Sequence, residues 1–204
     1  MNLKQQQSEQ TKKRIADAAR ALFVQKGYKA TSIEDIVSAT GSSKGNIYYH
    51  FKSKEGLFLY LIEEWDREWI VHWTERAPEY PTASGKLYFM ADRLASDDLN
   101  HPLTKAADEF FRLEQKPTEV EAKVTEMRQR NLDFNEVLLA EGVAAGEFAP
   151  ADAKRLALLL EAVLLGAGQL SRRLPTDQTQ QLYHDAITVF LHGIIHHPES
   201  PLRT

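Results

Sequence analysis

Apolar residues recur along the chain with the spacing of α-helices. The first stripe follows an i, i+4, i+7, i+8 pattern, so its members share one side of a helix: Ile15, Ala19, Leu22 and Phe23. Gly27 comes next, and glycine commonly ends a helix because it adopts a left-handed backbone at little steric cost. The pattern predicts a first helix that stops at Gly27.

Two short helices should follow the first. Either Thr31 or Ser32 can cap the first of them, and two acids in its opening turn favour the helix dipole. Gly41 ends this helix, and the pair Ser42 and Ser43 begins the next. A helix, a glycine turn and two short helices form the plan of a helix-turn-helix module, whose last helix enters a DNA groove.

Helical periodicity continues beyond this module. Ser53 is expected to cap a fourth helix that runs from Lys54 towards Trp73. Further helices are predicted between Pro- and Gly-rich breaks, at 82–95, 103–115, 118–141, 151–171 and 176–197. No Val/Ile/Thr-rich segment alternates as a strand would. The sequence therefore predicts an all-α fold of about nine helices.

The domains follow from this reading. Residues 1–52 should form a DNA-binding helix-turn-helix domain with a flexible arm at 1–8. Residues 53–204 should form a larger helical domain for ligand binding and dimerisation, joined through the fourth helix and not through a flexible linker.

Composition fits a globular chain in a reducing compartment. Of 204 residues, 43% are hydrophobic and none is cysteine, which excludes disulfides and thiolate metal sites. The polar first ten residues lack the apolar core of a signal peptide. The longest apolar stretch, 156–170, is interrupted by Glu161 and is shorter than the ~20 residues that a bilayer span needs. We expect a cytoplasmic protein with no membrane segment.

Charge is distributed unevenly along the chain. Residues 1–56 carry ten Lys/Arg and five Asp/Glu, a net charge of +5, whereas residues 57–204 carry fifteen Lys/Arg and twenty-four Asp/Glu, a net charge of −9. A basic first quarter on an acidic body suits a protein that meets a polyanion with one end only. On this feature taken by itself, uneven surface charge without a function remains an alternative.

The third predicted helix has an inner and an outer side. Ile47 and Phe51, four residues apart, are expected to face a small core. The three residues between Ile47 and Phe51 span too wide an arc to be buried together. Hydroxyls and amides at the helix start suit phosphate oxygens, and the outward polar side chains suit base edges or phosphates. The candidate DNA-binding residues are Ser42, Ser43, Lys44, Gly45, Asn46, Tyr48, Tyr49, His50 and Lys54.

The segment 39–57 resembles the DNA-binding domain of the TetR family of bacterial repressors, and the resemblance extends over residues 15–61. Its motifs are a glycine, Ser-Lys-Gly, Tyr-Tyr-His-Phe and Lys-Glu-x-Leu, in order and without gaps. Ser42 replaces the aliphatic residue that the family has after the first glycine. The resemblance implies an all-helical homodimer that binds double-stranded operator DNA and leaves it when a small-molecule inducer binds.

A weaker resemblance continues into the larger half. It connects the chain with multidrug-binding members of the family that repress quaternary-ammonium efflux, through Trp69, Trp73, Pro102, Phe110 and the 141–147 turn. This resemblance implies control of an efflux or detoxification gene. An activator role remains an alternative to repression.

The helices predicted at 151–171 and 176–197 are apolar around most of their circumference. Such helices must be covered, and a four-helix bundle across a two-fold axis would cover them. We therefore expect a homodimer through these two segments. The internal core of a monomer is the alternative.

Aromatic and acidic residues point to a ligand site in the larger half. Trp65, Trp69 and Trp73 recur every four residues and share one face of the fourth helix, although core packing remains the first alternative for at least two of them. Aromatic rings with carboxylates suit a lipophilic cation. Glu161 stands among leucines and needs a partner if it is buried, a role that Arg128 could fill.

The candidate ligand-binding residues are Trp65, Trp69, Asp98, His101, Phe111, Asn131 and Glu161. The resemblance supports Trp69, Asp98 and Phe111. Where related repressors carry further acids and a tyrosine, this chain has Trp65, Arg128 and Asn131, so a cationic, aromatic, neutral or anionic inducer stays open. We expect most of the remaining acids to be solvated, among them Asp66, Asp97 and Glu109.

Two other classes of protein compete with a regulator. An enzyme is disfavoured, because the chain has no Gly-rich phosphate loop and no Gly-x-Ser-x-Gly elbow. His192 and His196 have the spacing of a metal pair, but Gly193 replaces the glutamate of a metalloprotease. We therefore expect no catalytic residues, no metal and no cofactor. A helical scaffold would leave the basic N-terminal quarter unexplained, and salt-dependent duplex binding would distinguish the two.

Overall fold

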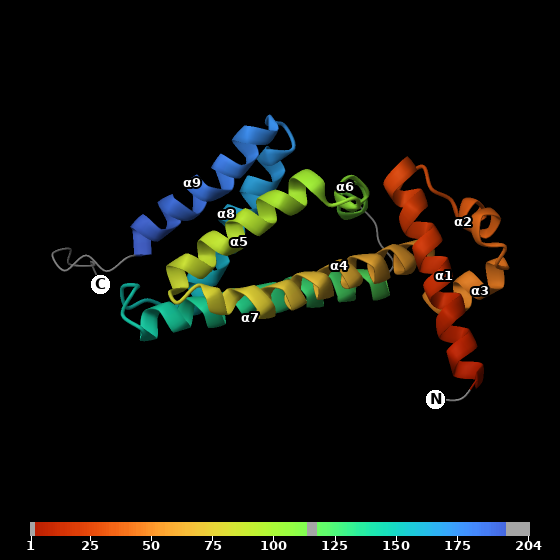
Figure 1. The fold of residues 1–204 in the computed structure, drawn as a ribbon, viewed down its shortest axis with the longest axis horizontal. Helices are drawn as coiled ribbons and strands as arrows, with labels where there is room; N and C mark the ends of the chain where they lie inside the picture. Colours follow the sequence, from red (N-terminus) through yellow and green to blue (C-terminus); the bar gives the residue numbers. More distant parts are fainter. Residues whose placement is uncertain (1–2, 114–117, 195–204) are drawn as a thin grey trace. The chain divides into compact units, whose positions relative to one another are not determined.

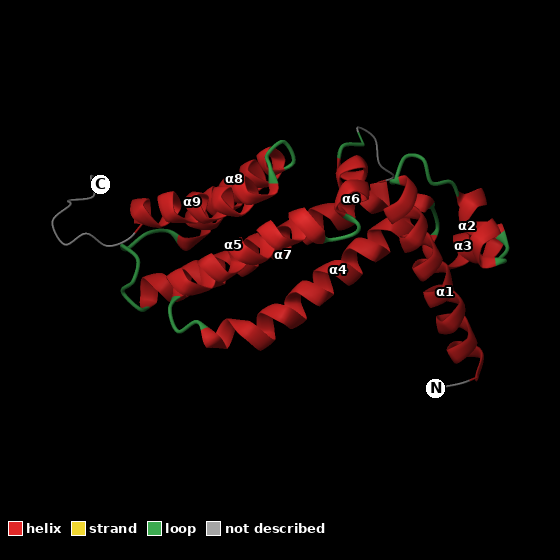
Figure 2. Cartoon of the chain, turned by 45° about the horizontal axis from the view of Figure 1, so that its top comes forward, coloured by secondary structure: helices red, strands yellow, loops and turns green. Residues whose placement is uncertain are grey.

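The computed structural model describes residues 3–113 and 118–194, without the side chains of 98–100 and 176. Over these residues the chain is built from helices and holds no β-strand element (Figure 2). Nine α-helices and one short 3-10 helix follow one another in the described part (Figure 1). They are α1 (Leu3–Lys26), α2 (Ile33–Thr40), α3 (Lys44–Phe51), α4 (Lys54–Arg76), η1 (Ala77–Glu79), α5 (Ala83–Asn100), α6 (Thr104–Phe111), α7 (Thr118–Ala144), α8 (Ala153–Ser171) and α9 (Thr176–Ile194). The predicted all-α fold is confirmed.

The start of the chain differs from the prediction. Residues 3–8, expected as a flexible arm, belong to α1, which begins at Leu3. Lys and Gln make up four of these six residues, and such straight-chain residues lose little side-chain freedom in a helix. The helix therefore continues beyond the apolar stripe that marks its buried part.

The helices group into two compact units. The first comprises residues 1–72 and 102–123, and the second comprises residues 73–101 and 124–204. The division falls inside α4 and inside α7, so both helices belong partly to each unit. We predicted a domain boundary after residue 52, just before α4, whereas the compact units divide near the end of α4. The assignment of DNA binding and ligand binding to the two predicted domains stays a prediction.

An aromatic cluster forms the centre of the first unit. Phe58 of α4 lies edge-on to Phe23 of α1, with 4.8 Å between ring centroids. Tyr28, from the turn after α1, lies 5.0 Å from Phe58 and 5.2 Å from Phe110 of α6. Edge-to-face contacts of this kind add to the free energy that burial of the rings supplies. The cluster joins three helices and one turn, and it fixes the module that carries α2 and α3.

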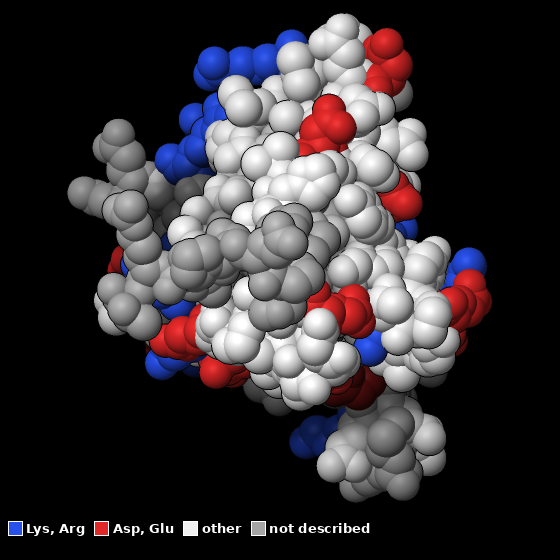
Figure 3. Space-filling view, turned by 90° about the vertical axis from the view of Figure 1, so that its left-hand side faces the viewer, with Lys and Arg blue, Asp and Glu red and all other residues white. Residues whose placement is uncertain are grey.

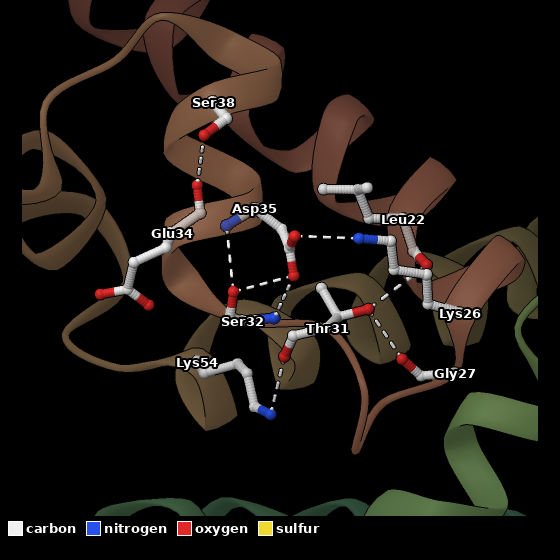
Figure 4. A network of polar contacts seen from close by, with 9 residues as sticks. All are labelled: Leu22, Lys26, Gly27, Thr31, Ser32, Glu34, Asp35, Ser38 and Lys54. Atoms are coloured by element: carbon white, nitrogen blue, oxygen red, sulfur yellow. Dashed lines mark hydrogen bonds and ion pairs between the residues drawn. The ribbon is translucent and has the colours of Figure 1, made fainter.

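Local capping explains where α2 begins. The Ser32 hydroxyl accepts the backbone N–H of Asp35, and the Asp35 carboxylate accepts the backbone N–H of Ser32, which is a reciprocal capping box. Lys26 donates to the same carboxylate across 2.9 Å (Figure 4). Thr31, the other predicted cap, instead donates its hydroxyl to the carbonyls of Leu22 and Gly27.

Three long helices of the second unit pack against one another. Helix α5 packs on α9 and on α8, and α8 packs on α9 (Figure 1). Tyr88 of α5 stacks on His184 of α9, with ring centroids 4.7 Å apart. The turn after α7 holds the start of α5, because the Glu147 carboxylate accepts the backbone N–H groups of Ala83 and Ser84.

On the face in Figure 3, uncharged side chains cover most of the described surface, with acidic and basic groups scattered among them. Among the described helices, none is both long enough and apolar enough to cross a membrane.

Two glycines with positive φ provide a matched test of this fold. Gly27 (φ 84°) and Gly41 (φ 64°) end α1 and α2. A Cβ on Gly41 would meet nothing within 4 Å, so Gly41→Ala should cost only the strain of a left-handed backbone, about 1–2 kcal/mol. A Cβ on Gly27 would lie 2.7 Å from a Glu109 carboxylate oxygen, and that carboxylate accepts the Lys29 backbone N–H.

Gly27→Ala should therefore cost roughly 1 kcal/mol more than Gly41→Ala, because the displaced carboxylate loses its hydrogen bond. Urea denaturation of the two variants measures the difference. Equal losses of stability would show that Glu109 does not hold the turn after α1.

Candidate DNA-binding face and ligand-binding residues

Helix α3 presents two different sides. Ile47 is fully buried and Phe51 is 5% exposed, and both face the core together with Phe23 and Ile36 as predicted. On the other side Tyr48 is 42% exposed and Tyr49 is 77% exposed. An exposed tyrosine pair on a short helix is unusual because large rings are normally covered. The helix therefore offers a polar, aromatic surface to a partner.

The loop before α3 uses its serines within the protein. Ser43 caps α3 by accepting the backbone N–H of Asn46. Ser42 is buried, and its hydroxyl accepts a hydrogen bond from Arg14 of α1 across 3.2 Å. We predicted that the Ser42 side chain would face a phosphate, but in the structure it is buried against Arg14. It ties the turn between α2 and α3 to α1.

Lys54 also differs from its predicted role. Its ammonium donates to the carbonyls of Tyr28 and Thr31, both across 3.0 Å, and lies over the Tyr28 ring at 4.3 Å. Partial burial lowers the pKa of Lys54 below its ordinary value. The sequence placed Lys54 on the positive rim, whereas the structure engages its charge at the junction of α1, α2 and α4.

The outward residues of α3 differ in how far they interact with the rest of the protein. Gly45 and Asn46 are exposed, and His50 is half-buried. Lys44 is paired with Glu34 of α2 across 2.7 Å. His50 has a pKa below its ordinary value because of burial and the nearby charge of Lys12, so it is neutral at neutral pH. The face that remains for a partner comprises Lys44, Gly45, Asn46, Tyr48 and Tyr49.

The predicted ligand-binding residues are divided between the two units. Trp65 and Trp69 of α4 and Phe111 of α6 lie in the first unit, where both tryptophans are half-buried. His101 and Glu161 lie half-buried in the second unit, where Asn131 is exposed. The side chain of Asp98 lies outside the described residues. The grouping of these seven residues in one site stays a prediction.

Glu161 has the internal partner that its position required. Its carboxylate on α8 accepts a hydrogen bond from Asn135 of α7 across 3.3 Å. Burial raises the pKa of Glu161, although the charge of Arg128 and the hydrogen bond from Asn135 act in the opposite direction. Arg128 acts on Glu161 through its charge, and its predicted role as the partner of this carboxylate stays a prediction. Asn135, one helical turn beyond the predicted Asn131, is the amide that contacts Glu161.

Two acids that we expected in solvent are engaged with the protein. Asp97 is 7% exposed and pairs with Arg93 across 3.1 Å on α5. The Nε atom of Arg93 is buried without a hydrogen-bond partner among the described residues. Glu109 of α6 accepts the Lys29 backbone N–H across 2.8 Å. Glu109 is followed by Phe110 and Phe111, which was a signal for burial, whereas Asp97 lies between Ser96 and Asp98, which gave none.

Trp73 packs in an aromatic group of the second unit. It lies 5.6 Å from Phe89 and 4.8 Å from Phe134, measured between ring centroids, and Tyr80 stacks on Phe89 at 4.9 Å. This agrees with the core role that we allowed for part of the tryptophan stripe. The second unit therefore contains both aromatic surface and the partly buried Glu161 carboxylate.

The outer side of α8 and α9 leaves large apolar residues uncovered within one chain. Leu158, Leu165 and Val189 are between 53% and 72% exposed. Leu158 and Leu165 lie seven residues apart and so share one face of α8. Exposed apolar residues that share a helix face make this side of α8 a candidate interface.

The predicted histidine pair is only half described. His192 is exposed on α9, and His196 lies outside the described residues. Within the described part of the chain, no group of three or more His, Asp or Glu side chains is arranged to hold a metal ion.

Comparisons with known proteins divide the chain inside α4, between residues 61 and 65. The family model for bacterial regulatory proteins of the tetR family matches residues 15–61, and the model for the C-terminal region of QacR-like proteins matches residues 65–196. The chain is 27% identical to the HTH-type transcriptional regulator QacR of Staphylococcus aureus over 183 residues, which cover 90% of this chain and 97% of that protein.

Two solved structures share the fold. One is the transcriptional regulator FadR from Bacillus subtilis in complex with stearoyl-CoA, with a TM-score of 0.74, 23% identity, and coverage of 90% of this chain and 98% of that one. The other is a transcriptional regulator from Saccharomonospora viridis in complex with choline, with a TM-score of 0.72, 22% identity, and coverage of 93% and 100%.

Substitution of Glu161 tests the balance of charges around it. Because the folded chain holds the Glu161 proton more tightly than the unfolded chain, this carboxyl contributes stability at low pH and loses it as the pH rises through its folded pKa. Glu161→Gln should therefore be more stable than the wild type at pH 7. The gain should disappear below about pH 4, near the pKa of an unfolded glutamate.

Thermal melting of both proteins between pH 4 and pH 8 measures this dependence. Glu126→Gln, at an exposed glutamate of α7 that pairs with Arg130, is a control expected to change stability little. A wild type that is more stable than Glu161→Gln at pH 7 would show that Arg128 outweighs the cost of burial.

Proposed function

The chain belongs to the TetR family of bacterial regulatory proteins and is a ligand-responsive, DNA-binding transcriptional repressor, and on that premise we propose that α3 is the helix that reads the operator. The observation that carries this assignment is the two-sided character of α3. Ile47 and Phe51 anchor the helix to the core, while Tyr48 and Tyr49 stay exposed without a covering element. A recognition helix needs this combination of a fixed back and an open front.

The proposed DNA-binding face combines several contact types. The Lys44 ammonium and the Asn46 amide can donate to phosphates or base edges, and the tyrosine hydroxyls can reach the sugar-phosphate backbone. Gly45 lets the helix backbone approach DNA closely. Ser42 and Lys54 support this face from behind, through Arg14 and through the carbonyls before α2.

For the dimer, we propose that α8 and α9 of two chains form a four-helix bundle. The exposed leucines of α8 and Val189 of α9 would be covered in this arrangement. A two-fold axis would present two α3 helices one DNA turn apart, ~34 Å, or a multiple of it.

We infer that the inducer is a small lipophilic molecule and that the regulated gene serves efflux or detoxification. Support comes from the aromatic group around Trp73 and the partly buried Glu161 in the second unit. The similar structure with choline and the one with stearoyl-CoA carry a cationic and a lipid ligand. Arg93 pairs with Asp97, and the charge of Arg128 acts on Glu161, so neutral ligands fit as well as cations.

Ligand entry would change the spacing of the paired DNA-binding modules. For a 99:1 reversal of the bound fraction, the ligand must prefer the released form by ~5.5 kcal/mol. We propose a cytoplasmic location, because operator DNA lies there, and a regulatory role without catalysis, because the matched family consists of regulators.

Lys44→Ala and Tyr49→Ala test the recognition face. Each should weaken binding to a duplex selected from random DNA by ~1–3 kcal/mol and leave the dimer intact. Lys154→Ala, which removes an exposed lysine from α8, is the charge-matched control and should bind like the wild type. Fluorescence anisotropy with labelled duplex gives the affinities, and wild-type affinity in both α3 variants would reject the face.

Leu165→Glu tests the proposed dimer surface. A charge at this exposed position of α8 should shift sedimentation from dimer to monomer, because it would have to be buried without a partner. Val137→Glu introduces the same charge at an equally exposed residue of α7 and should leave the dimer unchanged. A dimer that survives Leu165→Glu, or one that is lost in Val137→Glu, would move the interface away from α8.

A further inference from the structure

A carboxylate lies beside the proposed DNA-binding face, where a polyanion would be expected to disfavour it. Glu34, in the first turn of α2, accepts a hydrogen bond from the ammonium of Lys44, the first residue of α3, across 2.7 Å. In helix-turn-helix modules the helix before the recognition helix crosses the DNA backbone. Glu34 thus shares the region of the phosphates with the lysine that it binds.

The start of α2 does not need Glu34. Asp35 already supplies the acid of the first turn, bonded to the backbone and hydroxyl of Ser32 and to the ammonium of Lys26. In Figure 4 the Glu34 carboxylate points away from this capping group. The neighbouring acids therefore do different things: Asp35 holds the helix start, and Glu34 holds Lys44.

The pair is also too exposed to serve the fold. The side chains of Glu34 and Lys44 are 69% and 55% exposed, and surface ion pairs of this kind contribute little to stability. Their mutual influence is still visible in protonation, since Lys44 lowers the pKa of Glu34 and Glu34 raises the pKa of Lys44. The pair therefore matters chiefly for other anions that would bind the Lys44 ammonium, because they must displace the Glu34 carboxylate.

We propose that Glu34 limits the affinity for DNA by competing with phosphate for the ammonium of Lys44. The inference rests on the proposed function, because it requires α3 to meet DNA. When DNA binds, a phosphate replaces the Glu34 carboxylate at Lys44. Separating the ion pair costs free energy, which reduces the net free energy of DNA binding. Without Glu34, Lys44 would be available before DNA arrives, and every duplex would bind more tightly.

The experiment is a double-mutant cycle with Glu34→Gln, Lys44→Ala and the double variant, measured by anisotropy on a duplex selected from random DNA. Glu34→Gln should bind about two- to five-fold more tightly than the wild type, the range typical of an exposed ion pair. The gain should shrink as salt rises, because salt screens exposed charges. In the Lys44→Ala background, Glu34→Gln should change affinity little.

Glu126→Gln is the matched control. Glu126 is also 69% exposed and paired with an arginine, but it lies on α7, so the substitution changes net charge equally without touching the DNA-binding face. It should leave affinity unchanged. Circular dichroism and thermal melting verify that Glu34→Gln folds, and Glu34→Ala provides a second variant with the same expected gain.

Two results would overturn the inference and leave the proposed function intact. The first is unchanged or weaker DNA binding by both Glu34 variants. The second is an equal or larger gain in affinity from Glu34→Gln in the Lys44→Ala background, which would indicate direct repulsion between Glu34 and DNA. Wild-type affinity of Lys44→Ala, or a wild type that binds no duplex, would overturn the proposed role of Lys44 together with the inference.

Discussion

The burial of four aromatic rings in the first unit is the constraint on which the DNA-binding face depends. Tyr28 and Phe58 contact each other and both Phe23 and Phe110, with ring centroids at most 5.7 Å apart. They come from α1, the turn after it, α4 and α6, so their packing fixes the base on which α2 and α3 stand. With that base in place, Ile47 and Phe51 can anchor α3 by its inner side, and the opposite side stays open.

Polar contacts then set the orientation of the short helices on this base. The Ser32–Asp35 capping box starts α2, Lys54 holds the backbone in front of it, and the bond from Arg14 to Ser42 fixes the turn into α3. The charges of Arg14 and Lys54 behind α3 are thereby engaged within the protein. The charge that remains at the front, on Lys44, is shared with Glu34.

Sequence reasoning succeeded where the physical cause is local. Helix ends follow from glycine and serine chemistry, so Gly27, Gly41 and Ser43 were located from the sequence, and helical spacing placed Ile47 and Phe51 inside. It was less successful where the cause is a long-range contact. Ser42 and Lys54 were expected at the surface, but their partners come from segments more than twenty residues away. Asn135, the amide that contacts Glu161, was not among the predicted residues, because the contact joins α7 and α8 across twenty-six residues of sequence.

The most direct test of the account is the salt dependence of binding to a duplex selected from random DNA. If α3 meets DNA through cations and phosphates, the logarithm of the association constant should fall linearly with the logarithm of salt concentration, with a slope near −0.9 for each phosphate neutralised. The slope should become shallower by about one when Lys44 is replaced. A folded wild-type protein that ignores duplex DNA at low salt, or binds it with no dependence on salt, would contradict the account.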